Sequence, residues 1–281
     1  MSAASPGLRE VNVVAVCYQC PADRLVASLQ RIAQRHGVAL RGVLVCNRAQ
    51  ELPAGLHELG FDAAAGSNAL LDFSGFFEGL ERLLATRPEA AAGNVLFVND
   101  TLFTKHAAPC ILGRVLRHDA LLRQLKLPAI AGKLDPYRSI CRQNPWSGDR
   151  GFVTTFCYLV NARGLPIVRQ LRSLAAHDDV FADAAVGDEA WGRKMPAALR
   201  EHIRAHLAYE GSPYLWPPAG STPADHLRKK AACVYLESRL SGAIGREGAL
   251  VPINSGPRAS TDIFVREFVA RIARTARAQA E

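Results

Sequence analysis

Between residues 11 and 100 the chain alternates short apolar runs with longer amphipathic segments. The apolar runs VNVVAVCY (11–18), RGVLVCN (41–47) and VLFVND (95–100) have the length and continuous hydrophobicity of buried strands. The segments between them, DRLVASLQRIAQRHG after Pro21 and LDFSGFFEGLERLLATRP at 71–88, carry apolar residues at helical spacing. Strands of this kind between amphipathic helices predict an α/β fold, in which helices cover both faces of a mostly parallel sheet.

The second half of the chain is less regular. A possible helix, CILGRVLRHDALLRQL, precedes a turn-rich stretch up to residue 150 that we expect to form a long loop. The next strand is FVTTFCYLVN (152–161), and helices are predicted between it and residue 177, at 196–209 and at 224–242. We therefore expect one α/β domain at 1–210 and a helical C-terminal extension at 211–281 packed on it.

The composition is that of an ordinary globular protein, with 49% hydrophobic and 21% charged residues among 281. No apolar run reaches 18 residues, and the first residues, MSAASPGLREVN, lack the basic and apolar regions of a secretory signal. We therefore expect a cytoplasmic protein. Seven scattered cysteines predict no disulfide framework, and Cys17-x-x-Cys20 lacks the second Cys/His pair that a zinc site needs.

The net charge of +8 favours anionic partners without choosing among them. Because the basic residues are spread along the chain and are not interleaved with aromatic residues, we expect no nucleic-acid partner. The last segment, IFVREFVARIARTARAQA after Asp262, predicts an amphipathic basic helix. Such a helix either docks on its own protein, which is the commoner case, or lies on an anionic membrane surface.

Several common catalytic motifs are absent from the sequence. There is no G-x-x-x-x-G-K-[ST] loop, no G-x-G-x-x-G after the first strand, no H-E-x-x-H and no G-x-S-x-G. The sequence therefore gives no support for a P-loop ATPase, a Rossmann dehydrogenase, a zincin or a serine hydrolase.

Polar residues gather where the predicted parallel strands end. In open α/β sheets ligands bind at this carboxyl edge, and here it carries Tyr18-Gln19, Asn47-Arg48 and Asn99-Asp100-Thr101. A carboxylate in the position of Asp100 could hold a divalent cation that bridges a diphosphate. The alternative is a turn residue that caps the following segment.

A second group of candidates follows the strand at 152–161. Asp188 or Glu189 could act as a general base beside Trp191, with Arg193 and Lys194 nearby for a phosphate. The alternative is the acidic first turn of a helix, with the tryptophan in the core. Lys133, in the long loop with Arg138 and Arg142, could contact phosphates or belong to a solvated basic surface.

These elements, in this order, resemble the nucleotide-sugar glycosyltransferases of the GT-A fold, especially the inverting family-two type and the bacterial proteins related to rhamnan synthesis. The resemblance covers about residues 11–195 and depends on several short matches. They are VVAVCYQCPADRLVASL for the first strand and helix, VLVCNRA for the turn that meets the nucleoside, GSNALLDFSGFFEGL for the segment beneath the sugar nucleotide, VLFVNDT for the Asp-x-Asp position, and GDEAWGRKM for the acceptor-side acids.

The resemblance implies transfer of a sugar from a nucleoside diphosphate sugar to a hydroxyl of a bacterial surface polysaccharide or lipid-linked oligosaccharide, with inversion. It implies that Tyr18 and Asn47 hold the nucleoside, Asn68 and Asn99 the ribose or sugar, and Asp100 the diphosphate, through magnesium or manganese. Asp188 or Glu189 would deprotonate the acceptor, and Trp191 could stack on a sugar. A lipid-linked acceptor would bring the protein to the inner membrane surface.

The sequence departs from the family at Asn99-Asp100-Thr101, where neutral residues replace the first and third acids of Asp-x-Asp. One interpretation is that Asp100 alone holds the metal, together with water and diphosphate oxygens. A second is a site without metal, in which Arg and Lys stabilise the leaving diphosphate. Another is a GT-A-like domain that has lost catalysis and binds a glycan or takes part in polysaccharide assembly.

Overall fold

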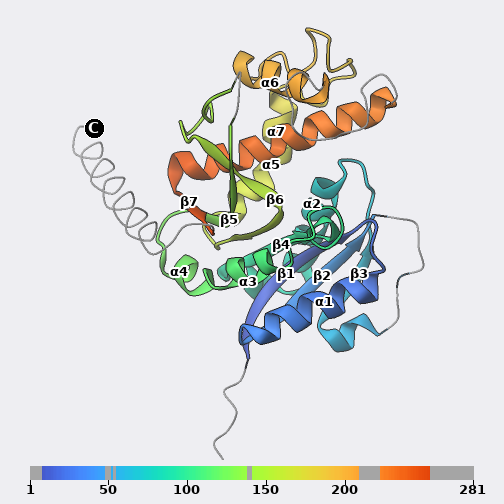
Figure 1. Cartoon of the computed structure of the whole chain (residues 1–281), viewed down its shortest axis with the longest axis vertical. Coiled ribbons are helices and arrows are strands. Elements are labelled where there is room, and N and C mark those ends of the chain that lie inside the picture. The colour runs from blue at the N-terminus through green and yellow to red at the C-terminus, as the bar shows by residue number, and fades with distance from the viewer. Residues whose placement is uncertain (1–7, 48–51, 53–54, 138–140, 209–221, 254–281) are drawn as a thin grey trace, which may run out of the picture.

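The computed structural model describes residues 8–47, 52, 55–137, 141–208 and 222–253 (Figure 1). The strands are β1 (Arg9–Cys17), β2 (Val38–Cys46), β3 (Phe61–Ala65), β4 (Val95–Asn99), β5 (Ala129–Pro136), β6 (Gly151–Val160) and β7 (Ala249–Pro252). The α-helices are α1 (Ala22–Arg35), α2 (Asp72–Thr86), α3 (Cys110–Leu116), α4 (Asp119–Gln124), α5 (Leu165–His177), α6 (Ala197–Ala208) and α7 (Ala224–Glu247). Three short 3₁₀ helices are η1 (Leu56–Leu59), η2 (Pro88–Ala92) and η3 (Asp100–Leu102).

The described strands form one mixed sheet in the order β3-β2-β1-β4-β6-β5-β7. Only β6 runs against its neighbours β4 and β5, and the other pairs are parallel. The carboxyl ends of β1, β2, β4 and β5 therefore share one edge with the first residues of β6. The sequence-based prediction of an α/β fold with a mostly parallel sheet is confirmed.

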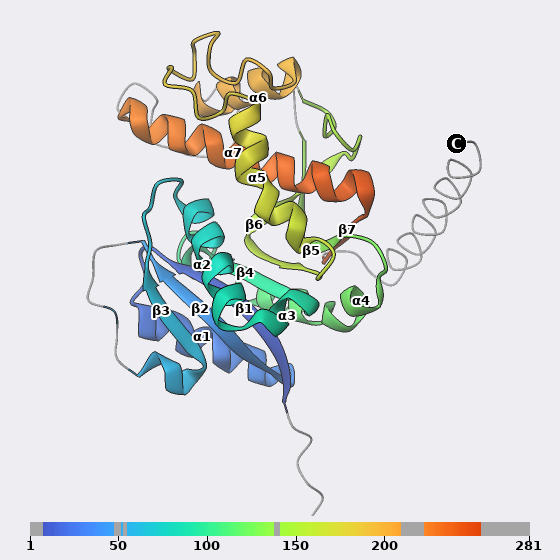
Figure 2. The same cartoon turned by 180° about the vertical axis from the view of Figure 1, so that it is seen from behind.

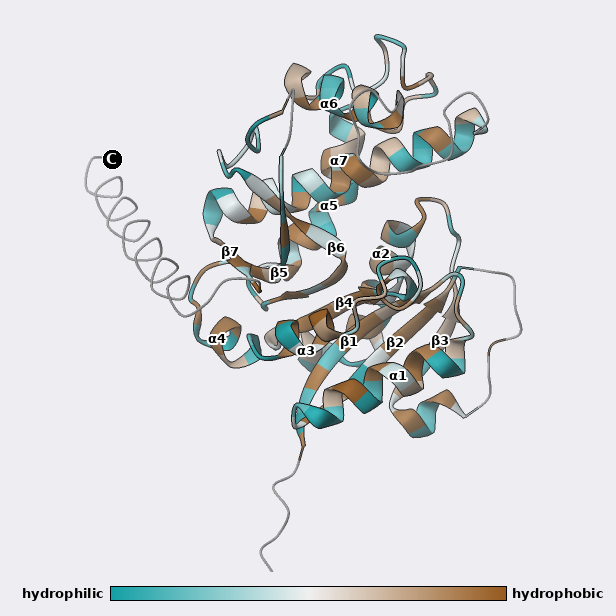
Figure 3. Cartoon of the chain, viewed as in Figure 1, coloured by the Kyte–Doolittle hydropathy of each residue, from teal (hydrophilic) through white to brown (hydrophobic). Residues whose placement is uncertain are grey.

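Helices cover both faces of the sheet, and a separate hydrophobic cluster lies on each side. Val11, Val13 and Ala15 of β1 pack toward α1 and α3, whereas Val14 and Val16 pack toward α2, α5 and α7. This alternation follows from the period of two along a strand. Figures 1 and 2 show α1 and α2 on opposite sides of β1 and β2, and Figure 3 shows apolar residues along the central strands.

The predicted boundary at residue 210 does not divide the described structure. Within 211–281 the described segment is 222–253, and its strand β7 pairs with β5 in the central sheet. Its helix α7 packs on β6 through buried side chains that include Tyr235 and Leu240. The predicted helical extension is therefore part of the same α/β layer structure, because its strand completes the sheet edge.

The stretch predicted as a loop up to residue 150 contains strand β5. Gly132 lies at an irregularity of the β5–β6 register, where a Cβ would come within 2.4 Å of Val153 Cγ1. A glycine and a terminal proline weaken the strand pattern in sequence, although the close approach of β6 requires the glycine. The helix predicted at 110–125 is also divided, into α3 and α4.

No helix in the described parts of the chain is both long enough and apolar enough to cross a membrane. The amphipathic helix predicted after Asp262 lies outside the described residues, as do Arg138 and Arg48.

Candidate functional site

Asp100 holds the loop that follows β1 to the end of β4. Its Oδ2 accepts the backbone N–H groups of Tyr18 at 2.9 Å, of Cys20 at 2.7 Å and of Gln19. The side chain has no solvent exposure, and the other oxygen, Oδ1, is buried without a hydrogen-bond partner among the described residues. Since buried N–H groups need acceptors, the carboxylate satisfies three donors that the end of a strand would otherwise leave unpaired.

The bonds described for Asp100 involve one carboxylate oxygen only. Oδ2 accepts three N–H donors, whereas Oδ1 is buried and has no hydrogen-bond partner among the described residues. Among the residues that the structure describes, no three His, Cys, Asp or Glu side chains gather as a metal-binding group. The binding of magnesium or manganese by Asp100 stays a prediction.

Asn99 and Asn47 are also tied to the main chain. Asn99 Oδ1 accepts from the backbone N–H and the hydroxyl of Thr101 and so caps η3. Asn47 Nδ2 donates to Leu71 O at 2.9 Å and links the end of β2 to the start of α2. Both asparagines are nearly buried. The structure thus brings Asn47, Asn99 and Asp100 to one edge of the sheet, as predicted. Each makes local bonds, while Asn47 Oδ1 and Asp100 Oδ1 are buried without a hydrogen-bond partner among the described residues.

The remaining predicted donor-side residues lie nearer the surface. Tyr18 and Asn68 are both half-buried. The backbone of Asn68 is in the left-handed region, with φ 51°. An asparagine tolerates that conformation better than most residues. Lys133 Nζ forms an ion pair with Asp135 Oδ1 at 2.8 Å on β5. All three residues keep partial solvent exposure, but Asn68 Oδ1 is buried and has no hydrogen-bond partner among the described residues.

The predicted acceptor-side residues separate from one another. Trp191 has no solvent exposure, and its Nε1 donates to Val180 O at 3.1 Å. It is a core residue, so the prediction that it offers a platform for a sugar is wrong. Asp188 and Glu189 lie in an exposed turn before α6, where the Asp188 carboxylate accepts from Ala190 N at 2.9 Å.

Other polar contacts of this turn are made by main-chain oxygens. Arg204 on α6 donates to the carbonyl of Asp188 at 2.7 Å, and Arg200 donates to that of Glu189 at 3.4 Å. The contacts described for the two acids therefore connect them to their own turn and to α6, and none connects them to the strand ends.

Asp72, the first residue of α2, lies beside the strand ends, and its carboxyl group has a raised pKa. Burial raises its pKa to about 6, and the Asp100 charge adds to this, while Lys230, a hydrogen bond from Asn99 and Lys105 act in the opposite direction. The residue keeps partial solvent exposure. A carboxyl group with a pKa of about 6 changes its protonation near neutral pH.

Glu237, on α7, is the second perturbed carboxyl group. Its Oε1 accepts the backbone N–H of Thr155 at 2.7 Å and the Thr155 hydroxyl at 3.1 Å. Oε2 makes no hydrogen bond with another described residue, which leaves it able to accept a proton. Burial raises the pKa of Glu237 to about 7, the Thr155 bonds lower it, and the charges of Asp135 and Asp72 raise it. A group with a pKa near the working pH suits general acid–base catalysis.

Lysines complete this cluster at the carboxyl edge. Burial lowers the pKa of Lys105, the nearby charge of Lys230 lowers it further, and Asp72 opposes both. The pKa of His106 is lowered by burial and then by Lys105 and Lys133. Two ammonium groups near each other repel, so an anion bound between them would relieve that repulsion. We refer to Asp72, Lys105, Lys230 and Glu237 as the edge cluster.

A recess of about 250 Å³ is lined in part by Lys229, the chain neighbour of Lys230, but by no member of the edge cluster. It lies between the loop before α2, the segment 180–183 and the first turns of α7, where Cys233 Sγ donates to Leu70 O at 3.3 Å. Phe181 lines it and is 38% exposed. An accessible aromatic ring beside polar groups can pack against an apolar ligand face.

Sequence reasoning missed Asp72, Lys105, Lys230 and Glu237. A signal for Glu237 was present, because Cys233, Glu237 and Ser241 recur at intervals of four and share one face of α7 with buried residues. Ser241 Oγ accepts from Val153 N at 2.9 Å, so this polar stripe faces β6. A carboxylate on the buried face of a helix is rare unless it is paired or functional.

The chain matches no known protein-family model, and no curated protein sequence shows significant similarity to it.

Proposed function

We propose that this protein transfers a sugar, with inversion, from a nucleoside diphosphate sugar to a hydroxyl of a bacterial surface polysaccharide or lipid-linked oligosaccharide. The observation that carries the proposal is the edge cluster, which combines a carboxyl group of pKa about 7 with two lysines at the carboxyl edge of the sheet. The mixed sheet with helices on both faces is compatible with the GT-A fold that the sequence resembles.

The donor diphosphate would bind against Lys105 and Lys230. An ammonium group is a compact charge that suits phosphate oxygens, and charge develops on the diphosphate as the bond from the anomeric carbon to its oxygen breaks. Tyr18, Asn68 and Lys133 flank this position and would contact the nucleoside and sugar. A partly desolvated setting strengthens the attraction between the lysines and the leaving group.

Glu237 would act as the general base. Oε2 accepts the proton of the acceptor hydroxyl while the hydroxyl oxygen forms the new bond to the anomeric carbon, and the diphosphate leaves with the electron pair of the broken bond. Such a proton transfer is typically worth about 10² to 10⁴ in rate. Because Oε1 is fixed by Thr155, the orientation of the carboxylate is set before substrate binds.

The acceptor would enter through the recess beside α7. Its volume of about 250 Å³ and the exposed ring of Phe181 suit one sugar unit at the end of a longer glycan. If the acceptor is lipid-linked, the protein would work at the surface of the inner membrane from the cytoplasmic side.

The test is release of nucleoside diphosphate from a panel of sugar donors in the presence of glycan acceptors. Glu237→Gln should lower kcat by at least about 10²-fold with a small change in donor KM. Glu247→Gln, which changes an exposed glutamate on the same helix, should retain full activity. If Asp188→Asn abolishes turnover and Glu237→Gln does not, the base is assigned to the wrong carboxylate.

Metal dependence is checked in the same assay. Since Asp100 is engaged with the main chain, we expect turnover to persist in EDTA and to gain little from added magnesium or manganese. A requirement for either ion would contradict the role given to the lysines.

A second candidate function is a catalytically silent GT-A-like domain that binds a glycan or supports polysaccharide assembly. The observation that favours it is again Asp100, because the one acid left at the Asp-x-Asp position is buried and its Oδ2 accepts three backbone N–H groups. No turnover with any donor and acceptor, together with glycan binding that Phe181→Ala weakens, would favour this function.

A further inference from the structure

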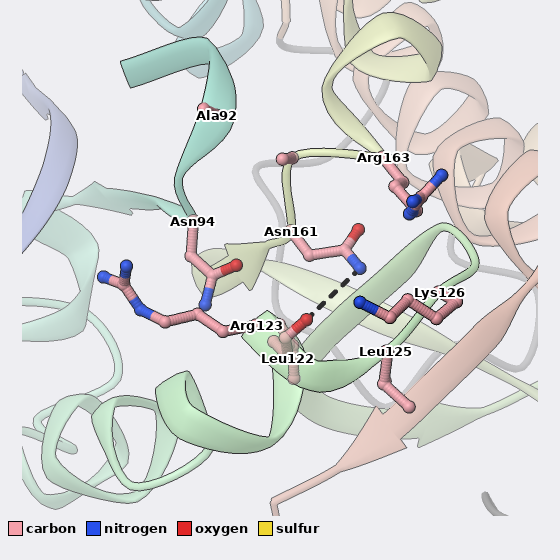
Figure 4. Close-up of a pocket in the computed structure, with 9 residues that line it drawn as sticks. Ala92, Asn94, Leu122, Arg123, Leu125, Lys126, Asn161 and Arg163 are labelled. Carbon is pink, nitrogen blue, oxygen red and sulfur yellow. Dashed lines mark hydrogen bonds between the residues drawn. The ribbon is translucent and has the colours of Figure 1, made fainter. Parts of the chain in front are cut away.

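A second recess, of about 390 Å³, lies at the opposite edge of the sheet. Asn94, which precedes β4, and Asn161, which follows β6, form part of its wall, and the end of α4 and the segment before α5 form the rest (Figure 4). Its size falls in the range of small-molecule sites. The edge cluster is at the carboxyl ends of the parallel strands, so the two sites are distinct.

The walls of this recess are basic. Arg123, Lys126 and Arg163 line it, and none of its lining residues is acidic. Figure 4 shows the side chains of Lys126 and Arg163 on the same side as Asn161, whereas the guanidinium of Arg123 points away. An ion pair holds Arg123 in this orientation, since its Nε lies 3.0 Å from Asp119 Oδ2.

Arg163 has no such partner, since it forms no ion pair with any residue in the described ranges. It is exposed and precedes Gly164, the N-cap residue of α5, which is a helix of 13 residues. The amino-terminal end of a helix carries a partial positive charge, which adds to that of the arginine and of Lys126. The positive potential in the recess is therefore not cancelled by carboxylates on its walls.

The recess is also held rigidly. Asn161 Oδ1 accepts from Ala129 N at 2.9 Å and Gly164 N at 3.0 Å, and its Nδ2 donates to Leu127 O at 2.9 Å. Asn94 Nδ2 donates to Asp119 Oδ1 at 2.8 Å. Because these amides fix the ends of β4, β5 and β6 around the opening, a ligand would not have to order the walls on binding.

We propose that this recess binds the phosphate group of a small molecule, with Arg163 and Lys126 as its charged contacts. A guanidinium donates two parallel hydrogen bonds to phosphate oxygens, and a lysine adds a point charge. The phosphate belongs either to a free metabolite or to a lipid headgroup. The proposal does not depend on the glycosyl-transfer activity, because it uses residues at the other edge of the sheet.

Isothermal titration calorimetry of the full-length protein with inorganic pyrophosphate at low ionic strength tests this site. We expect Arg163→Ala to weaken binding at least tenfold, because charge-assisted hydrogen bonds are lost. Arg172→Ala is the matched control, since it removes the same charge from an exposed position about two turns along α5 and should change the dissociation constant less than twofold. Cosedimentation with phosphatidate vesicles, compared with phosphatidylcholine vesicles, separates a lipid headgroup from a free phosphate.

The edge cluster could also attract pyrophosphate, so Lys105→Ala is measured in parallel. Loss of binding in Lys105→Ala but not in Arg163→Ala would overturn the second site and leave the proposed function standing. Equal weakening by Arg163→Ala and Arg172→Ala would reduce the effect to net charge and also overturn it. So would the absence of Arg163-dependent binding to both pyrophosphate and phosphatidate vesicles.

Discussion

Replacement of Asp100 separates a structural role from a metal-binding role. Asp100→Ala removes the one acceptor shared by the backbone N–H groups of Tyr18, Gln19 and Cys20. The residue is fully buried, so water does not replace the lost oxygen without reorganisation of the loop. We expect this variant to be strongly destabilised, whether or not any ion is present.

The magnitude depends on the number of bonds lost. Hydrogen bonds to a charged group contribute about 1.5 to 3 kcal/mol each, and bonds that share one acceptor contribute less than their sum. We expect Asp100→Ala to lower the free energy of unfolding by about 3 to 5 kcal/mol. Asp100→Asn keeps one acceptor oxygen but loses the charge, and it should cost about 1 to 3 kcal/mol.

The assay is equilibrium unfolding in urea, followed by fluorescence and by far-UV circular dichroism, whose coincidence tests two-state behaviour. With a urea m-value of about 2 to 3 kcal/mol/M, the midpoint of Asp100→Ala should fall by roughly 1 to 2 M. Asp62→Ala, on the exposed side of β3, is the control and should leave the midpoint nearly unchanged. A midpoint for Asp100→Ala within about 0.3 M of the wild type would refute the anchoring role.

Three other substitutions should have measurable effects on stability. The pKa of Glu237 is raised to about 7 from an ordinary 4.5. The stabilisation by the protonated carboxyl group is therefore complete below about pH 4.5 and is lost as the pH rises through 7. In urea unfolding, the free energy of unfolding of Glu237→Gln should gain about 1 to 3 kcal/mol relative to that of the wild type between pH 4.5 and pH 8. Trp191→Ala should lower the free energy of unfolding by about 3 to 5 kcal/mol, measured in the same way, because it empties a fully buried site. Gly42→Ala should cost about 2 to 3 kcal/mol in thermal and urea unfolding, because the new Cβ would lie 1.9 Å from Val13 O.

The sequence predicted the parts of the fold whose local patterns agree with their environment. The runs at 11–18, 41–47 and 95–100 became β1, β2 and β4, because strands buried on both faces are continuously apolar. Strand β3, FDAAA, was missed because it is short and alanine-rich. Strand β7 was missed because it has only four residues, follows Gly248 and ends at Pro252. Such strands are defined by their neighbours in the sheet rather than by their own propensity.

Helix α7 shows the same limit. Its predicted end at residue 242 was five residues short, since the helix extends to Glu247 through two glycines that disfavour a helix interior. The structure explains both glycines, because a Cβ at Gly242 would come within 2.3 Å of Asn144 Oδ1 and one at Gly245 within 2.3 Å of Asp149 Oδ2. Close tertiary packing that sequence cannot show outweighs local propensity here.

The sequence predicted that Asn47, Asn99 and Asp100 lie at the carboxyl edge of the sheet, and they lie there. It did not predict the edge cluster. It did not locate Asp72 and Glu237, because their proximity depends on how α2 packs on β1 and β2 and how α7 packs on β6, on the same face of the sheet. Helical periodicity gives the face of each helix, but not which strand end that face meets.

The polar residues at the strand ends and those of the edge cluster serve different physical needs. Where a buried strand ends, the next N–H groups still require acceptors, and Asp100, Asn99 and Asn47 are bonded within the fold for that reason. These bonds leave two buried oxygens, Asp100 Oδ1 and Asn47 Oδ1, without a hydrogen-bond partner among the described residues. Glu237, which projects from α7, has an Oε2 that makes no hydrogen bond with another described residue. The residues Asn99, Asp100 and Thr101 at the end of β4 therefore show how that strand end is capped, and under the proposed function we expect activity to depend on Glu237.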